Sequence, residues 1–125
     1  MSALSPRARL ASISYALAGL VALVRTQANA RIHLAATVAV VVLGLAVRLA
    51  PWEWVSVTLA VAIVWTAEAL NTGLEHLCDV VTREFHPSIK AAKDIAAGGV
   101  LVAALGAALV GAIVFLPHIW PLLGF

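Results

Sequence analysis

The stretch that decides the fold is IAAGGVLVAALGAALVGAIVFL, residues 95–116, which contains 22 positions without a charged side chain. A helix of this length rises about 33 Å, enough to cross the roughly 30 Å hydrocarbon core of a bilayer. The whole chain shares this character, because 63% of its 125 residues are hydrophobic and 11% are charged. Soluble domains have about 45–50% apolar and about 25% charged residues. The sequence therefore predicts one integral-membrane domain, residues 1–125.

Two shorter apolar blocks precede this span, at residues 34–47 and 54–67. Their flanks lengthen them, so we predict three transmembrane helices over residues 32–50, 53–81 and 90–117. Pro51 is expected to end the first of these, because proline lacks the N–H that continues a helix. Trp52 and Trp54 lie where an interfacial aromatic belt is expected.

Residues 1–30 are predicted to form a surface helix. Ser5 followed by Pro6 is typical of a helix N-terminus. Apolar residues then recur at helical spacing on one face, which suits an amphipathic helix in the membrane interface: Ile13, Leu17, Leu20, Val21 and Val24. An alternative is a secretory signal peptide, with an apolar segment at residues 10–24 and a cleavage site at residues 28–30. The predicted fold class is an all-α membrane protein, with an interfacial amphipathic helix and three transmembrane helices.

The positive charges predict the orientation. With three spans, only Arg48 lies on one side of the membrane, and the other seven of the eight Lys and Arg residues lie on the opposite side. Because Lys and Arg are enriched in cytoplasmic loops, we expect a cytoplasmic N-terminus and an external C-terminus. The net charge of +2 and the absence of a basic run give no reason to expect a nucleic-acid partner.

Five polar residues of the second span fall on one helix face at about 100° per residue: Glu68, Asn71, Thr72, Glu75 and Asp79. In the third span, Lys90, Lys93 and Asp94 share a face, and Ser88 is the expected N-cap. The connection at residues 82–87 is short, so the two polar faces should meet near the cytoplasmic surface.

A structural network of ion pairs at a helix end is one explanation of these polar faces. Ionisable residues within or beside a bilayer are costly, however, and usually functional. Carboxylates grouped in this way suit Mg²⁺, particularly Mg²⁺ carried by a phosphate ligand. For the remaining residues we expect modest roles: Cys78 as an apolar packing residue, His33 and His118 as interfacial side chains, and Gly98-Gly99 as a site of close helix packing.

Three segments resemble a known family, the bacterial integral-membrane diacylglycerol kinases. AEALNTGLEHLCD, residues 67–79, resembles the family signature. HPSIKAAKDIAAG, residues 86–98, is similar to a second block, particularly in the undecaprenol kinase branch. NARIH, residues 29–33, resembles an element that follows the family's surface helix. The resemblance covers nearly the whole chain and favours a retained surface helix over a signal peptide.

The resemblance implies a homotrimer in the bacterial inner membrane that uses MgATP to phosphorylate a lipid hydroxyl, of diacylglycerol or undecaprenol, from the cytoplasmic side. It implies that Glu68 is the catalytic base, and that Asn71 and Asp79 are further catalytic residues of the composite site. Glu75 corresponds to a metal ligand, and Gln27 stands where family members often have a second, glutamate ligand. The residues expected around the nucleotide are Tyr15, Gln27, Glu75, Glu84, Phe85, His86, Lys93 and Asp94. Ala8 replaces an expected arginine, although Arg7 and Arg9 flank it.

Two other functions stay open at this point. A small transporter also needs a membrane carboxylate such as Glu68, although that carboxylate would be expected near the middle of the membrane. A regulatory membrane subunit without activity is compatible with Gln27, because an amide lacks the charge of a metal-binding carboxylate.

Overall fold

The computed structural model describes residues 5–124, apart from the side chain of Leu123. It contains α1 (Pro6–Thr26), α2 (Ala28–Val47), α3 (Pro51–Val81), α4 (Pro87–Ile119) and a short 3₁₀ turn, η1 (Trp120–Leu123). Residues 1–4, the start of the predicted surface helix, lie outside the described residues. All four α-helices are long and apolar enough to cross a membrane. The all-helical membrane class is therefore confirmed, while α1 is also apolar enough to span.

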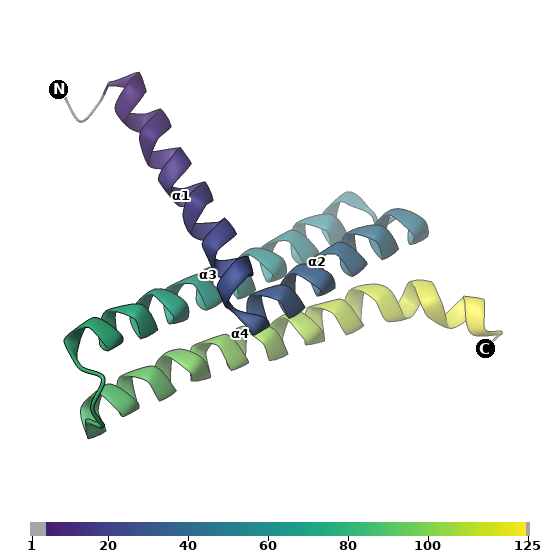
Figure 1. Cartoon of the computed structure of the whole chain (residues 1–125). Coiled ribbons are helices and arrows are strands. Elements are labelled where there is room, and N and C mark those ends of the chain that lie inside the picture. The colour runs from purple at the N-terminus through teal and green to yellow at the C-terminus, as the bar shows by residue number, and fades with distance from the viewer. Residues whose placement is uncertain (1–4, 125) are drawn as a thin grey trace.

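The longest helices, α3 and α4, form an antiparallel hairpin, and α2 packs along the half of it that lies away from the hairpin turn (Figure 1). The turn end of the hairpin, coloured green in Figure 1, extends beyond the start of α2. Helix α1 projects from the other three at a steep angle and joins α2 through the single residue Gln27. The junction between α1 and α2 thus lies partway along α3, where Thr26 lines one pocket with Ala69 and Thr72.

The helix ends follow local chemistry, but the predicted end of α2 was wrong. Ser5 caps α1, since its Oγ accepts a hydrogen bond of 3.2 Å from the Ala8 N–H. Pro51 does not end α2; it begins α3. Helix α2 stops earlier because Arg48 takes the left-handed conformation (φ 56°), and the Leu49 N–H then bonds back to the Gly44 carbonyl at 3.0 Å. These bonds form a Schellman motif, with arginine where glycine is usual.

The predicted cap of α4 was also wrong. The helix starts at Pro87, and His86 is its N-cap. The Nδ1 atom of His86 accepts a hydrogen bond of 3.2 Å from the Ser88 N–H. Ser88 is therefore the donor that the cap satisfies, rather than the cap itself.

A small core lies where α2, α3 and α4 meet near the C-terminal end of α4. Its buried residues are Leu49, Val57, Val114 and Phe115. Gly44 lets the Trp54 ring approach α2, because a Cβ there would lie 2.7 Å from the ring. A Cβ at Gly98 or Gly99 would meet no atom within 4 Å, so close packing at that pair does not occur within the single chain. Cys78 is buried, as predicted for a packing residue.

A polar contact joins the start of α3 to the end of α4 at the same end of the bundle. The buried Glu53 side chain accepts a hydrogen bond of 2.7 Å from the Ala50 N–H through Oε2. Its Oε1 lies 2.9 Å from His118 Nε2. His118 therefore has a specific partner, which the prediction of a general interfacial role did not include.

We expect Glu53→Ala to lower the melting temperature in detergent micelles, because it leaves the Ala50 N–H and His118 without their shared acceptor. Glu53→Gln is the matched control: its amide can still accept from Ala50 and donate to His118, so it should melt close to the original protein. Equal melting temperatures for Glu53→Ala and the unmodified chain would contradict a stabilising role.

Candidate active site

Three polar residues of α3 are buried on one face. Glu68 is 2% exposed, and Asn71 and Thr72 are also buried. Buried polar atoms nearly always have a hydrogen-bond partner. Within the described residues, however, Glu68 Oε2, Asn71 Oδ1 and Thr72 Oγ1 have none. This cluster is therefore costly to the fold in the single chain, and it is suited to a ligand that supplies the missing partners.

The polar face continues along α3 toward the hairpin turn and becomes progressively exposed. The Asn71 Nδ2 donates to Glu75 Oε1 at 3.3 Å, and Glu75 is half-buried. Further along, Lys93 Nζ of α4 donates to Asp79 Oδ1 at 2.7 Å. The two polar faces thus meet at the turn end of the hairpin, as the short connection predicts. Lys90 and Asp94 form a second ion pair one turn apart on α4.

An open polar pocket of about 510 Å³ lies at the hairpin turn. It contains five of the residues that the resemblance places around the nucleotide: Glu84, Phe85, His86, Lys93 and Asp94. Asp79 and Lys90 also line it. The pocket therefore combines carboxylates, two ammonium groups and the exposed Phe85 ring, which are groups able to contact phosphates and a flat heterocycle.

Two predicted site residues lie elsewhere in the chain. Tyr15 is exposed on α1. Gln27 lies at the junction between α1 and α2, where its Nε2 donates to Thr26 Oγ1 at 3.4 Å. Neither residue lines the pocket at the hairpin turn.

The carboxylates fit one kind of metal site. Within residues 5–124, no three His, Cys, Asp or Glu side chains group so as to hold a metal ion. Mg²⁺ often binds through only one or two carboxylates together with substrate phosphates and water. The half-buried Glu75 therefore suits a metal that arrives with a phosphate ligand.

His33 is the site residue that sequence reasoning missed. Its Nε2 lies 3.8 Å from Glu68 Oε2, and neither atom has a hydrogen-bond partner among the described residues. The side chain is 16% exposed and faces α3. Position 33 carries a histidine within the NARIH segment, but the single sequence contains no signal that pairs it with Glu68.

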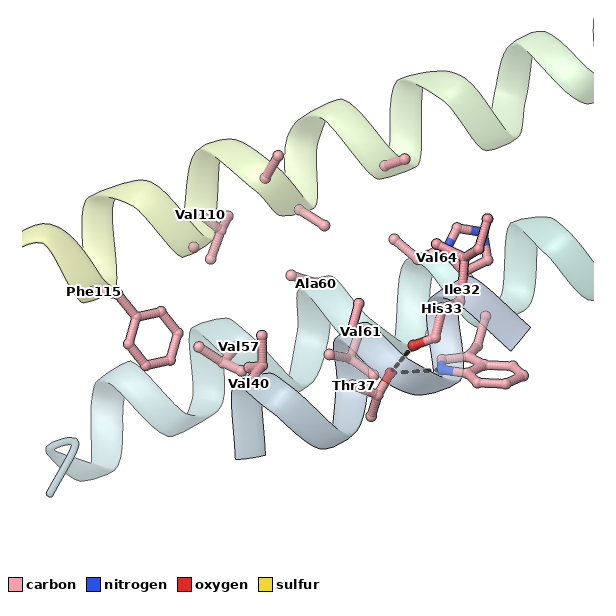
Figure 2. A pocket seen from close by; sticks show the side chains of 16 residues that line it. Ile32, His33, Thr37, Val40, Val57, Ala60, Val61, Val64, Val110 and Phe115 are labelled. Carbon is pink, nitrogen blue, oxygen red and sulfur yellow. Dashed lines mark hydrogen bonds between the residues drawn. The ribbon is translucent and has the colours of Figure 1, made fainter. Parts of the chain in front are cut away.

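An apolar groove of about 380 Å³ runs between α2, α3 and α4. Figure 2 shows it from His33 at one end to Phe115 at the other. Small side chains form much of its wall: Ala36, Ala60, Ala104, Ala107, Ala108 and Gly111. Near His33, Trp65 Nε1 donates to Thr37 Oγ1 at 3.0 Å and connects α3 to α2. His33 lines this groove and also faces Glu68, so it connects the apolar groove to the polar cluster.

The sequence comparisons identify the family. Residues 14–115 match the family described as prokaryotic diacylglycerol kinase. An undecaprenol kinase from Bacillus subtilis is 41% identical over 95 residues, which cover 76% of this chain and 77% of the relative. A diacylglycerol kinase from Synechocystis sp. is 38% identical over 115 residues, which cover 91% of this chain and 66% of the relative.

The chain belongs to the prokaryotic diacylglycerol kinase family and is, as a member, a membrane lipid kinase. This membership supports the resemblance found in residues 67–79 and 86–98. It disfavours both alternatives, the transporter and the inactive regulatory subunit.

Proposed function

We propose that this protein transfers the γ-phosphate of ATP to the hydroxyl of a membrane lipid alcohol in a Mg²⁺-dependent reaction. The observation that carries the proposal is Glu68, a buried carboxylate with an unpartnered oxygen, close to the end of an apolar groove and on a polar face that leads to an open charged pocket. This arrangement suits a reaction between a lipid and a water-soluble donor, because each substrate has its own approach to the carboxylate.

In the proposed reaction, the lipid hydroxyl oxygen attacks the γ-phosphorus, and the bond from that phosphorus to the oxygen retained by ADP breaks. Glu68 accepts the hydroxyl proton, so the products are a lipid phosphate and ADP. Asn71 fixes Glu75 through its side-chain hydrogen bond. Lys93, held by Asp79, contributes positive charge beside the phosphates. Mg²⁺, held by Glu75 with Gln27 as a neutral second ligand, would neutralise charge on the nucleotide.

We assign the hydrocarbon chain of the lipid to the apolar groove and the nucleotide to the pocket at the hairpin turn. Phe85 and His86 would contact the base, and Tyr15 on α1 would approach the nucleotide from another direction. Two acceptors are proposed: diacylglycerol, giving phosphatidic acid, and undecaprenol, giving undecaprenyl phosphate. The names of the two relatives support this pair of acceptors.

In the proposed membrane arrangement, α2, α3 and α4 span the bacterial inner membrane and α1 lies on its cytoplasmic surface. Glu68 lies about 25 Å along α3 from Pro51, at about 1.5 Å per residue. If Pro51 and Trp52 mark one interface of a core about 30 Å thick, Glu68 lies close to the other. The steep angle of α1 to the bundle fits a helix in the plane of that interface (Figure 1). The distribution of positive charges supports placing this interface on the cytoplasmic side.

We further propose a homotrimer whose sites are completed by neighbouring chains. Glu75 lies on α3, whereas Gln27 and Tyr15 lie at and before the start of α2, away from the pocket at the hairpin turn. Large apolar side chains are exposed on all four helices, so the chain has surface available for lipid and for partner copies alike.

The first prediction for this function separates the base from the metal ligand. Glu68→Gln should abolish transfer of labelled γ-phosphate to diacylglycerol and undecaprenol in vesicles, while nucleotide binding stays largely intact, because little ground-state binding is lost. Glu75→Gln should weaken Mg²⁺-dependent nucleotide binding as well. Near-normal turnover in Glu68→Gln would disprove the assignment of the base. No transfer to either lipid by the unmodified protein would disprove the proposed function.

The second prediction concerns the apolar groove. Ala107→Leu should raise the KM for the lipid and leave the KM for MgATP unchanged, because the added methyl groups occupy space assigned to the hydrocarbon chain. Ala112→Leu, on the same helix but outside the groove, is the matched control and should change neither constant. An unchanged lipid KM in Ala107→Leu would show that the chain binds elsewhere.

The third prediction tests the composite site. Gln27→Leu removes the only side-chain oxygen at that position, and Glu75→Gln removes the carboxylate, so each variant alone should require more Mg²⁺ for half-maximal activity or be inactive. If neighbouring chains supply these two residues, co-assembled mixtures of the variants should recover activity, because some sites receive both intact residues. Activity no higher than the sum of the separate variants, at any mixing ratio, would place both residues within one chain's site.

A further inference from the structure

Two histidine–glutamate pairs lie within the part of the chain that the structure describes, one near each end of α2. At one end, His118 Nε2 lies 2.9 Å from Glu53 Oε1, and the second oxygen of Glu53 accepts from a backbone N–H. At the other, His33 Nε2 lies 3.8 Å from Glu68 Oε2, and both atoms are buried without a hydrogen-bond partner. The two side chains of the first pair are within hydrogen-bond distance of each other in the single chain. Those of the second pair point toward each other but are too far apart for a hydrogen bond. This difference suggests that the two pairs have different purposes.

We propose that His33 is a positioning residue for Glu68: the Nε2–H of its imidazole orients the carboxylate toward the lipid hydroxyl at the end of the apolar groove. This inference rests on the proposed role of Glu68 as the base. Catalytic hydrogen bonds are often long in ligand-free structures and shorten when substrate binds, so a separation of 3.8 Å suits a contact that closes in the reacting complex.

The position of His33 is fixed by contacts one helical turn away. The Thr37 Oγ1 donates to the His33 carbonyl at 2.7 Å and accepts from Trp65 Nε1 at 3.0 Å. Figure 2 shows these two hydrogen bonds beside the groove. Because Trp65 and Glu68 lie one turn apart on α3, the contact that connects α2 to α3 also sets the distance between His33 and Glu68. A residue held in this way can define where a carboxylate points.

Among the titratable side chains around the groove, His33 is the one that lies next to the Glu68 carboxylate. Helix α4 has no titratable side chain between Asp94 and His118, so its contribution to the groove is apolar. Among the described residues, Glu68 forms an ion pair with His33 alone. A neutral imidazole with its proton on Nε2 donates to the carboxylate and leaves it ionised, so the carboxylate stays able to accept the hydroxyl proton.

The two amide analogues of histidine make a sharp test. Glutamine places its NH₂ group close to the position of Nε2, whereas the shorter asparagine resembles the Nδ1 side and does not reach Glu68. In vesicles containing the lipid acceptor, His33→Asn and His33→Leu should lower kcat by about 10- to 100-fold, the range typical of partners that orient a functional side chain. The KM for MgATP should change little, and His33→Gln should recover most of kcat.

The complete pair at the other end supplies the control. His118→Asn should lower the melting temperature in detergent without lowering kcat of the folded protein. His33→Asn should lower kcat and leave the melting temperature close to that of the unmodified protein. Wild-type kcat in His33→Asn and His33→Leu, or a kcat in His33→Gln no higher than in His33→Leu, would overturn the assignment.

A second measurement decides the pairing without relying on activity. The ring-nitrogen NMR signals of His33, assigned by comparison with His33→Gln, should shift in Glu68→Gln and stay unchanged in Glu53→Gln. The His118 signals should show the reverse. An unmoved His33 signal in Glu68→Gln would overturn the pairing, whatever the protein phosphorylates. Absence of phosphate transfer by the unmodified protein, with a shifted His33 signal, would overturn the proposed function and the positioning role together, while leaving the pair itself established.

Discussion

The central constraint on this structure is the burial, in a bundle of apolar helices, of a carboxylate with an unpartnered oxygen, Glu68. An ionisable group is expensive in such surroundings unless a partner meets it, and here one oxygen is left without a hydrogen bond. Helix α3 places Asn71 and Thr72 on the same buried face. Each of these two residues also has an oxygen without a hydrogen-bond partner, so they add to the free-energy cost of burial instead of reducing it. A fold that retains this cost at one place, while apolar side chains dominate elsewhere, supports the proposal that Glu68 acts in the reaction.

The two ends of the bundle differ in whether their polar side chains have partners within the chain. Near the C-terminus of α4, Leu49, Val57, Val114 and Phe115 form a core, and Glu53 is fully satisfied by Ala50 and His118. At the other end, α2 begins late, so α3 and α4 continue beyond it and expose their polar faces around the hairpin turn (Figure 1). The closed end keeps the three helices together, and the open end can therefore contain groups whose partners come from substrates.

Much of this site was predictable because helical periodicity fixes the angle of each side chain. The spacing of Glu68, Asn71 and Asp79 was enough to place them on one face, and a short connection was enough to bring Lys93 to Asp79. The contact between His33 and Glu68 was not predictable, because it depends on how α2 is rotated against α3. That rotation comes from the close approach of Trp54 to Gly44 and the bond from Trp65 to Thr37. The end of α2 was missed because its left-handed residue is Arg48, a residue type that gives no such signal.

The geometry of α1 bears on how the chain meets the membrane. By length and composition α1 could cross a bilayer, as the other three helices could. A crossing antiparallel to α2 needs a connection that reverses the chain, and the single extended residue Gln27 instead directs α1 away at a steep angle. A crossing would also move Arg7 and Arg9 to the side of Arg48 and weaken the charge asymmetry from which the orientation is predicted. Both constraints favour the proposed position of α1 on the membrane surface, where its residues Leu23 and Thr26 line one pocket with Thr72 of α3.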